Sequence, residues 1–176
     1  TTINDNPVNN PENGTPGTPV EDGGYGSEDT VYAVITGDTS VVEGETAGYT
    51  VSLEDKDGNP VTVTEATEVT VVFTNGSTED ADTEYSNNQE ITVTIPAGGS
   101  SAPLDTDTVD DYLAEGSEDY TLTIDKVDTD EFENVVIGNV AGEEKDVTTT
   151  INDNPVNNPE NGTPGTPTEP TDPTDP

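Results

Sequence analysis

Apolar and polar residues alternate at every second position in five segments of the chain, at residues 47–53, 68–74, 90–96, 119–125 and 146–152. In the first segment Tyr49, Val51 and Leu53 share one face, and Thr50 and Ser52 share the other. This period of two predicts β-strands that bury one face and expose a threonine-rich face to water. No segment shows a convincing helical period, so the alternation restricts the chain to an all-β fold.

Shorter apolar runs at residues 31–36, 102–104 and 134–138 predict three more strands. Residues 55–60 contain Asp-Gly and residues 74–78 contain Asn-Gly, two dipeptides that supply the positive φ angles of tight turns. Seven to nine short strands with regular turns predict an immunoglobulin-like antiparallel β-sandwich. A closed β-barrel is the less favoured alternative.

Proline and aromatic residues are segregated along the chain. Of the 14 prolines, 11 lie in residues 1–29 and 155–176, whereas seven of the eight aromatic residues lie in residues 30–154. Proline-rich sequence without apolar periodicity favours extended, mobile chain. We therefore expect one sandwich domain at residues 30–154, with flexible linkers at residues 1–29 and 155–176.

Residues 1–19 are identical to residues 149–167, which gives a repeat period of 148 residues. Chance cannot produce an identity of this length, so residues 1–29 are expected to be the tail of a preceding unit. The chain is then one unit of a tandem array, in which domains are separated by linkers of about two dozen residues. Neighbouring repeats are the expected partners, and an isolated unit is expected to be monomeric.

The composition excludes several classes of function. The chain has no cysteine, no histidine and only three basic residues, all lysine, against 39 acidic residues, for a formal net charge of −36. Most nucleophile and general-base arrangements are unavailable in such a chain, so we expect no enzyme activity. So negative a surface also repels nucleic acid and anionic lipid, whereas it attracts cations.

The densest group of acids comes directly before the segment at residues 119–125. It contains Asp110, Asp111, Glu115 and Glu118, all of which are expected to be ionised at pH 7. Clustered carboxylates repel one another until a cation neutralises them, and calcium prefers oxygen ligands. The group predicts a calcium site, while the alternative interpretation is a solvated acidic loop.

Other oxygen ligands reach the same site if the ends of several strands meet. The candidates are Glu43 in one turn, Asp80, Asp82 and Glu84 in a second loop, and Asn152, Asp153 and Asn154 after the last predicted strand.

Five segments in this order resemble the Calx-beta family. They are "VVEGE" at 41–45, "VTVVFTNGST" at 69–78, "ITVTIPAGGSSAPL" at 91–104, "TVDDYLAEGSEDYTLTI" at 108–124 and "TTINDN" at 149–154. The resemblance implies an immunoglobulin-like sandwich that binds calcium. It places the family's ligands on Glu43, Asp110, Asp111, Glu115, Glu118 and the residues at 152–154. Where the family has a terminal run of aspartates, this chain has Asn152 and Asn154, which lowers the charge of the site.

Calx-beta domains also occur as tandem repeats in large bacterial adhesins of the RTX type, which are secreted to the cell surface. The resemblance and the repeat together predict an extracellular, calcium-ordered extender repeat of a cell-surface or biofilm adhesin. One alternative is a module that binds a glycan or another copy of itself. Another is a salt-adapted acidic domain without a specific ion.

Overall fold

The computed structural model describes residues 30–110 and 115–154. The expected linkers at 1–29 and 155–176 lie outside these residues, as does the candidate ligand Asp111. The described residues form nine strands and no helix: β1 (Thr30–Gly37), β2 (Ser40–Val42), β3 (Thr46–Glu54), β4 (Thr67–Asn75), β5 (Gln89–Ile95), β6 (Ser101–Asp107), β7 (Glu118–Asp128), β8 (Asn134–Ile137) and β9 (Asp146–Asn152). In this part of the chain no helix is long and apolar enough to cross a membrane.

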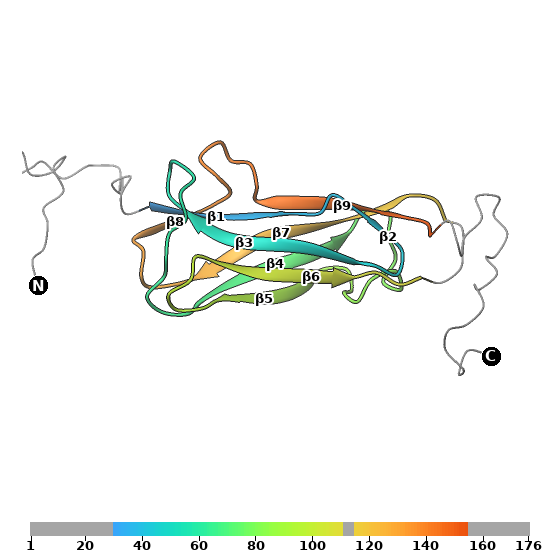
Figure 1. Ribbon diagram of the computed structural model, residues 1–176, viewed down its shortest axis with the longest axis horizontal. Coiled ribbons are helices and arrows are strands. Elements are labelled where there is room, and N and C mark those ends of the chain that lie inside the picture. The colour runs from blue at the N-terminus through green and yellow to red at the C-terminus, as the bar shows by residue number, and fades with distance from the viewer. Residues whose placement is uncertain (1–29, 111–114, 155–176) are drawn as a thin grey trace, which may run out of the picture.

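The strands form two sheets that pack face to face (Figure 1). One sheet has the order β6-β3-β1-β8, and the other has the order β2-β9-β7-β4-β5. The predicted all-β sandwich is confirmed, with the nine strands at the upper limit of the expected number. Neighbouring strands are antiparallel except for two parallel pairs, β1 with β8 and β2 with β9, which the prediction of an antiparallel sandwich did not include.

The parallel pair of β2 and β9 arises because the chain changes sheets after β1. β1 pairs with β3 in the first sheet, and only three residues later β2 pairs with β9 in the second. The crossover begins at Gly37, where a Cβ atom would lie 2.4 Å from the Tyr49 ring and 2.5 Å from the carbonyl oxygen of Gly48. Glycine is required there because two backbones and an aromatic ring approach one another closely.

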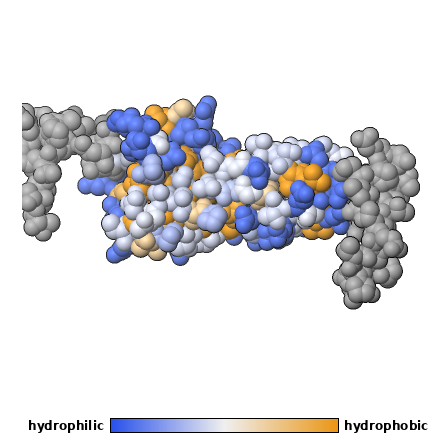
Figure 2. All heavy atoms as spheres, viewed as in Figure 1, coloured by the Kyte–Doolittle hydropathy of each residue, from blue (hydrophilic) through white to orange (hydrophobic). Residues whose placement is uncertain are grey.

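The core lies between the sheets and consists of the faces that the alternation predicted. Tyr49, Val51 and Leu53 of β3 are at most 3% exposed. The same buried cluster contains Val69, Val71 and Phe73 of β4 and Tyr120, Leu122 and Ile124 of β7. On the visible surface, hydrophobic areas are small and separated (Figure 2). Among the described residues the only large hydrophobic side chains that are exposed are Val109 and Val140. Apolar burial therefore accounts for the stability of the sandwich.

A buried hydroxyl network joins the two sheets inside this core. The Tyr49 hydroxyl lies 2.6 Å from the Tyr120 hydroxyl and 2.6 Å from Oγ1 of Thr149, which donates to the carbonyl oxygen of Asp38. Burial raises the pKa of Tyr49 and of Tyr120. Because each hydroxyl has a partner, the network satisfies polar groups that would otherwise be costly to bury.

Strand direction brings three loops and the segment after β9 to one end of the sandwich. β2, β4, β6 and β9 all run toward the end where β9 finishes, while β1 begins at the opposite end (Figure 1). The described chain therefore enters the domain at one end and leaves it at the other. We call the end where β9 finishes the acidic end; it comprises residues 43–45, 76–88, 108–110, 115–118 and 152–154.

Candidate metal site

Three carboxylates form the centre of the acidic end. Asp82, Glu115 and Glu118 each place one carboxylate oxygen within 4.8 Å of the other two. Glu118 is the first residue of β7, Glu115 precedes it in the loop from β6, and Asp82 comes from the loop between β4 and β5. None of the three lysines of the chain, Lys56, Lys126 and Lys145, lies in these loops, so no basic side chain of the domain neutralises the cluster.

Repulsion and burial change the protonation of this cluster. The pKa of Glu118 is raised from 4.5 to about 7, first by burial, then by a hydrogen bond with Asp82 and by the negative charges of Asp82, Glu115 and Glu79. With a pKa of about 7, Glu118 is only partly ionised at pH 7, whereas the sequence analysis expected full ionisation of the clustered acids. Burial and neighbouring negative charge both raise this pKa, and no basic side chain in these loops opposes them.

Glu43 and Asp110 form a second group beside the first, together with Asn154. Glu43 is only 8% exposed. The backbone N–H of Asn154 donates to Oε2 of Glu43 at 3.3 Å, and the Asn154 side-chain amide donates to Oδ2 of Asp110 at 3.1 Å. Gly44 has a φ of +78°, and a Cβ atom there would lie 3.1 Å from Cβ of Asp110. Residues more than 40 positions apart in sequence thus meet where the chain leaves β9.

Asp153 connects the two groups. Its Oδ1 accepts hydrogen bonds from the backbone N–H groups of Glu115 and Gly116, both at 3.2 Å, and its Oδ2 accepts a second one from Gly116 at 3.2 Å. The loops themselves are tied together because the N–H of Val109 donates to the carbonyl oxygen of Asp82 at 2.8 Å. The two groups therefore belong to one region of clustered oxygen atoms.

Other candidate ligands are used for structural hydrogen bonds. Oδ1 of Asn152 accepts from the hydroxyl of Ser117 at 2.9 Å. Oε1 of Glu84 accepts from the N–H of Asp107 at 2.9 Å, at the end of β6. Oδ1 of Asp80 accepts from the Asn75 side chain and from the N–H of Asn87, at 3.0 and 2.9 Å, which closes the base of the loop between β4 and β5.

The structure thus brings together Glu43, Asp82, Asp110, Glu115, Glu118, Asp153 and Asn154. It places Asn152 beside them and gives Glu84 and Asp80 partners elsewhere. Glu79 was missed by the sequence analysis, although its charge contributes to the raised pKa of Glu118. The sequence feature that could have identified Glu79 is its position three residues before Asp82. At this spacing the two residues form a turn, in which the Glu79 N–H donates to Oδ2 of Asp82 at 2.5 Å.

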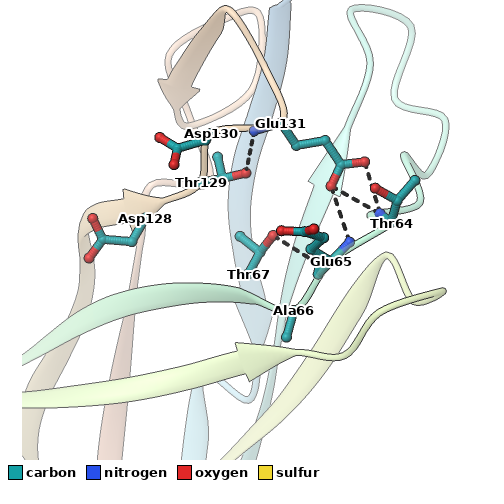
Figure 3. A pocket seen from close by; sticks show the side chains of 8 residues that line it. All are labelled: Thr64, Glu65, Ala66, Thr67, Asp128, Thr129, Asp130 and Glu131. Carbon is teal, nitrogen blue, oxygen red and sulfur yellow. Dashed lines mark hydrogen bonds between the residues drawn. The ribbon is translucent and has the colours of Figure 1, made fainter.

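A hollow of about 540 Å³ lies at the opposite end of the sandwich, lined by residues 64–67 and 128–131 (Figure 3). The Glu131 carboxylate points across it and accepts the N–H of Thr64 at 2.8 and 2.9 Å and that of Glu65 at 3.4 Å. The hydrogen bond from Thr64 lowers the pKa of Glu131. This carboxylate therefore joins two loops of the fold.

Comparison with known proteins supports the fold. No family model and no curated protein matches the chain. Among solved structures, the apo form of the Calx CBD1 domain aligns with a TM-score of 0.54 and 14% identity, over 70% of this chain and 97% of that one. The CBD12 structure from CALX1.2 aligns with a TM-score of 0.51 and 15% identity, over 70% and 45% of the two chains. The chain therefore has the fold of the Calx-beta domains that its sequence resembles.

Proposed function

We propose that this domain is a calcium-ordered extender repeat of a bacterial cell-surface adhesin, and that it projects a distal binding region away from the cell. The observation that carries the proposal is the cluster of Asp82, Glu115 and Glu118, which lies at the end where the chain leaves the domain and lacks a basic neighbour.

The available ligands favour a hard cation. The chain has no cysteine and no histidine, so a site at the acidic end has only oxygen atoms to offer. Calcium takes six to eight oxygen ligands. The central cluster offers three carboxylates, and Glu43, Asp110 and Asp153 lie at the same end of the sandwich as further acidic ligands. The Calx-beta resemblance independently points to calcium at this end of the fold.

The ends of the domain support a spacing role. Because the described chain enters at one end and leaves at the other, the full length of each sandwich adds to the length of the array (Figure 1). β7 alone has 11 residues, which corresponds to about 36 Å. The repeat at residues 1–19 and 149–167 supplies the tandem arrangement. In this proposal the repeats are extracellular, neighbouring repeats are the partners, and the unit has no catalytic role.

Calcium also acts at the junction with the linker. Asp153 and Asn154 belong to the acidic end and are the last described residues before the predicted linker at 155–176. An ion bound by Asp153 fixes these residues relative to the loops that carry Glu115 and Asp110. Calcium in the extracellular medium therefore sets the direction in which each linker departs from its domain.

The proposal is tested by thermal unfolding of the full chain with added calcium chloride. Extracellular calcium modules bind with dissociation constants of about 10⁻⁴–10⁻³ M. Free calcium at about ten times that constant stabilises a one-site domain by about 1.4 kcal/mol, which corresponds to roughly 3–6 °C in Tm. Sodium chloride at equal ionic strength is the control, because a salt-adapted domain without a specific ion responds equally to both salts.

A charge-matched pair of variants locates the effect. Glu115→Gln with Glu118→Gln removes two acids of the central cluster and should abolish the calcium-specific rise in Tm. Asp125→Asn with Asp146→Asn removes two exposed acids outside the acidic end and should preserve the rise. An equal response of both double variants would contradict the proposal.

A further inference from the structure

The side chains of the first three residues of β7 lie on two opposite faces of the strand. Because side chains alternate along a strand, Glu118 and Tyr120 lie on one face and Asp119 on the other. Glu118 belongs to the central cluster, and Tyr120 is fully buried in the core. Asp119 is half-buried and was not among the candidate ligands.

Asp119 holds the beginning of the loop that carries Asp82. Its Oδ1 accepts from the hydroxyl of Ser77 at 2.7 Å and from the N–H of Ser77 at 3.2 Å, while its own N–H donates to that hydroxyl at 3.0 Å. Its carbonyl oxygen accepts from the N–H groups of Gly76, Ser77 and Thr78 at 2.8, 3.1 and 3.3 Å. Oγ1 of Thr78 donates to the same carbonyl oxygen at 3.1 Å. Three consecutive loop residues thus bind one residue of β7.

The close approach at Gly76 shows how tightly the loop is placed. A Cβ atom at this position would lie 2.6 Å from the carbonyl oxygen of Asp119 and 2.6 Å from its Oδ2. Any larger residue would push the loop away from β7. The glycine and the hydrogen bonds therefore act together on the same contact.

A short turn connects Ser77, which is bonded to Asp119, to the candidate ligand Asp82. The N–H of Asp82 donates to the carbonyl oxygen of Glu79 at 3.3 Å, and Thr78, which precedes the turn, is only 5% exposed. Asp82 then meets Glu118, which is the neighbour of Asp119 in sequence. The loop is therefore anchored to β7 beside the residue that its own acid must reach.

We propose that Asp119 is a positioning residue for the cation site, because it holds the loop at residues 76–82 so that the Asp82 carboxylate lies against Glu118. Asp119 does not touch the ion. The proposal rests on the proposed function for the identity of the ion, but the placement of the loop is measurable without it.

The test compares Asp119→Ala with Asp119→Asn in the full chain, using calcium chloride in isothermal titration calorimetry. Alanine removes the acceptor of the Ser77 hydroxyl and should raise the Kd for calcium by about 10–100-fold, the range typical of residues that orient metal ligands. Asparagine keeps an acceptor oxygen and should remain within about threefold of the unchanged chain. Ser77→Ala removes the same bond from the loop side and should also weaken binding.

Asp55→Ala is the matched control. Oδ1 of Asp55 accepts the N–H groups of Asp57 and Asn59 at 2.8 and 2.9 Å, in a turn remote from the acidic end. This variant loses a loop-holding aspartate of the same chemistry, so it should lower stability without changing the Kd for calcium. Equal calcium affinity in Asp119→Ala and the unchanged chain would overturn the positioning role.

Amide hydrogen exchange in calcium-free buffer separates the two proposals. In Asp119→Ala the N–H groups of residues 76–82 should exchange at least tenfold faster, while those of β3 remain protected. If the unchanged chain binds no calcium, the proposed function fails, and this exchange result still decides the positioning role. Unchanged exchange at residues 76–82 would overturn it whatever the chain binds.

Discussion

Glu118 and Asp82 place carboxylate oxygens within 4.8 Å of each other, although Glu118 begins β7 and Asp82 comes from the loop between β4 and β5. Two carboxylates this close repel each other, and burial adds to the cost of ionising Glu118. The raised pKa of Glu118 therefore gives the acidic end a defined response to pH and to cations.

The ion-free domain should lose stability as the pH rises from about 4.5 to about 7. Over this window folded Glu118, with its pKa raised from 4.5 to about 7, binds more protons than unfolded Glu118. The contribution of Glu118 to the free energy of unfolding therefore decreases as the pH rises through this window. Urea unfolding in the presence of a chelator at pH 5, 6 and 7 measures the slope, and Glu118→Gln should flatten it. An equal slope in this variant would place the titrating group elsewhere.

Calcium binding should become tighter with pH and release a proton near neutrality. A group with a pKa of about 7 is largely protonated at pH 6 and largely ionised at pH 8, so the Kd for calcium should fall by about tenfold between them. Calorimetry in two buffers of different ionisation enthalpy measures the protons released. Calcium affinity that does not change from pH 6 to pH 8 would show that Glu118 is not a ligand.

Tyr49→Phe should destabilise the domain through its buried polar network. The substitution removes the Tyr49 hydroxyl, which lies 2.6 Å from the hydroxyl of Tyr120 and 2.6 Å from that of Thr149. Each of these two hydroxyls therefore loses one hydrogen-bond partner. A cost of about 1–3 kcal/mol in the free energy of unfolding is expected. The double variant with Tyr120→Phe should cost less than the sum of the single changes. Strict additivity would show that the two hydroxyls do not interact.

Gly37→Ala should be far more destabilising than Gly48→Ala. A Cβ atom at residue 37 would lie 2.4 Å from the Tyr49 ring, whereas one at residue 48 would have its nearest neighbour, Oδ1 of Asp105, at 3.7 Å. Chemical denaturation should give a loss above about 2 kcal/mol for the first variant and below about 1 kcal/mol for the second. Similar losses would mean that the crossover between β1 and β2 tolerates a side chain.

The core was predictable because burial imposes a period of two on every long strand. Val69, Val71 and Phe73 of β4 were expected on one face, and all three are fully buried. The strand β2 was not predicted, because three residues are too few for a period. The strand predicted at 102–104 extends in β6 to Asp107, and Thr106 within this extension is fully buried. A single buried threonine between two exposed aspartates does not produce the alternation of apolar and polar residues that predicts a strand.

The acidic end was predictable only as a set of residue types near strand ends. The positions of strand ends and the Calx-beta resemblance predicted that Glu43, Asp110 and Glu115 meet, but no sequence pattern gives the depth at which each carboxylate lies. The raised pKa of Glu118 depends on burial and on the approach of Asp82. The role of Asp119 depends on a loop contact 42 residues away in sequence. Both follow from tertiary packing, which local alternation does not encode.

The account depends most directly on whether the acidic end binds calcium. Isothermal titration calorimetry of the chelator-treated full chain with calcium chloride should give saturable binding with a Kd of about 10⁻⁴–10⁻³ M. Glu115→Gln with Glu118→Gln should lose this binding, while Asp125→Asn with Asp146→Asn should keep it. The absence of saturable heat up to millimolar calcium, or binding that both double variants retain unchanged, would contradict the account.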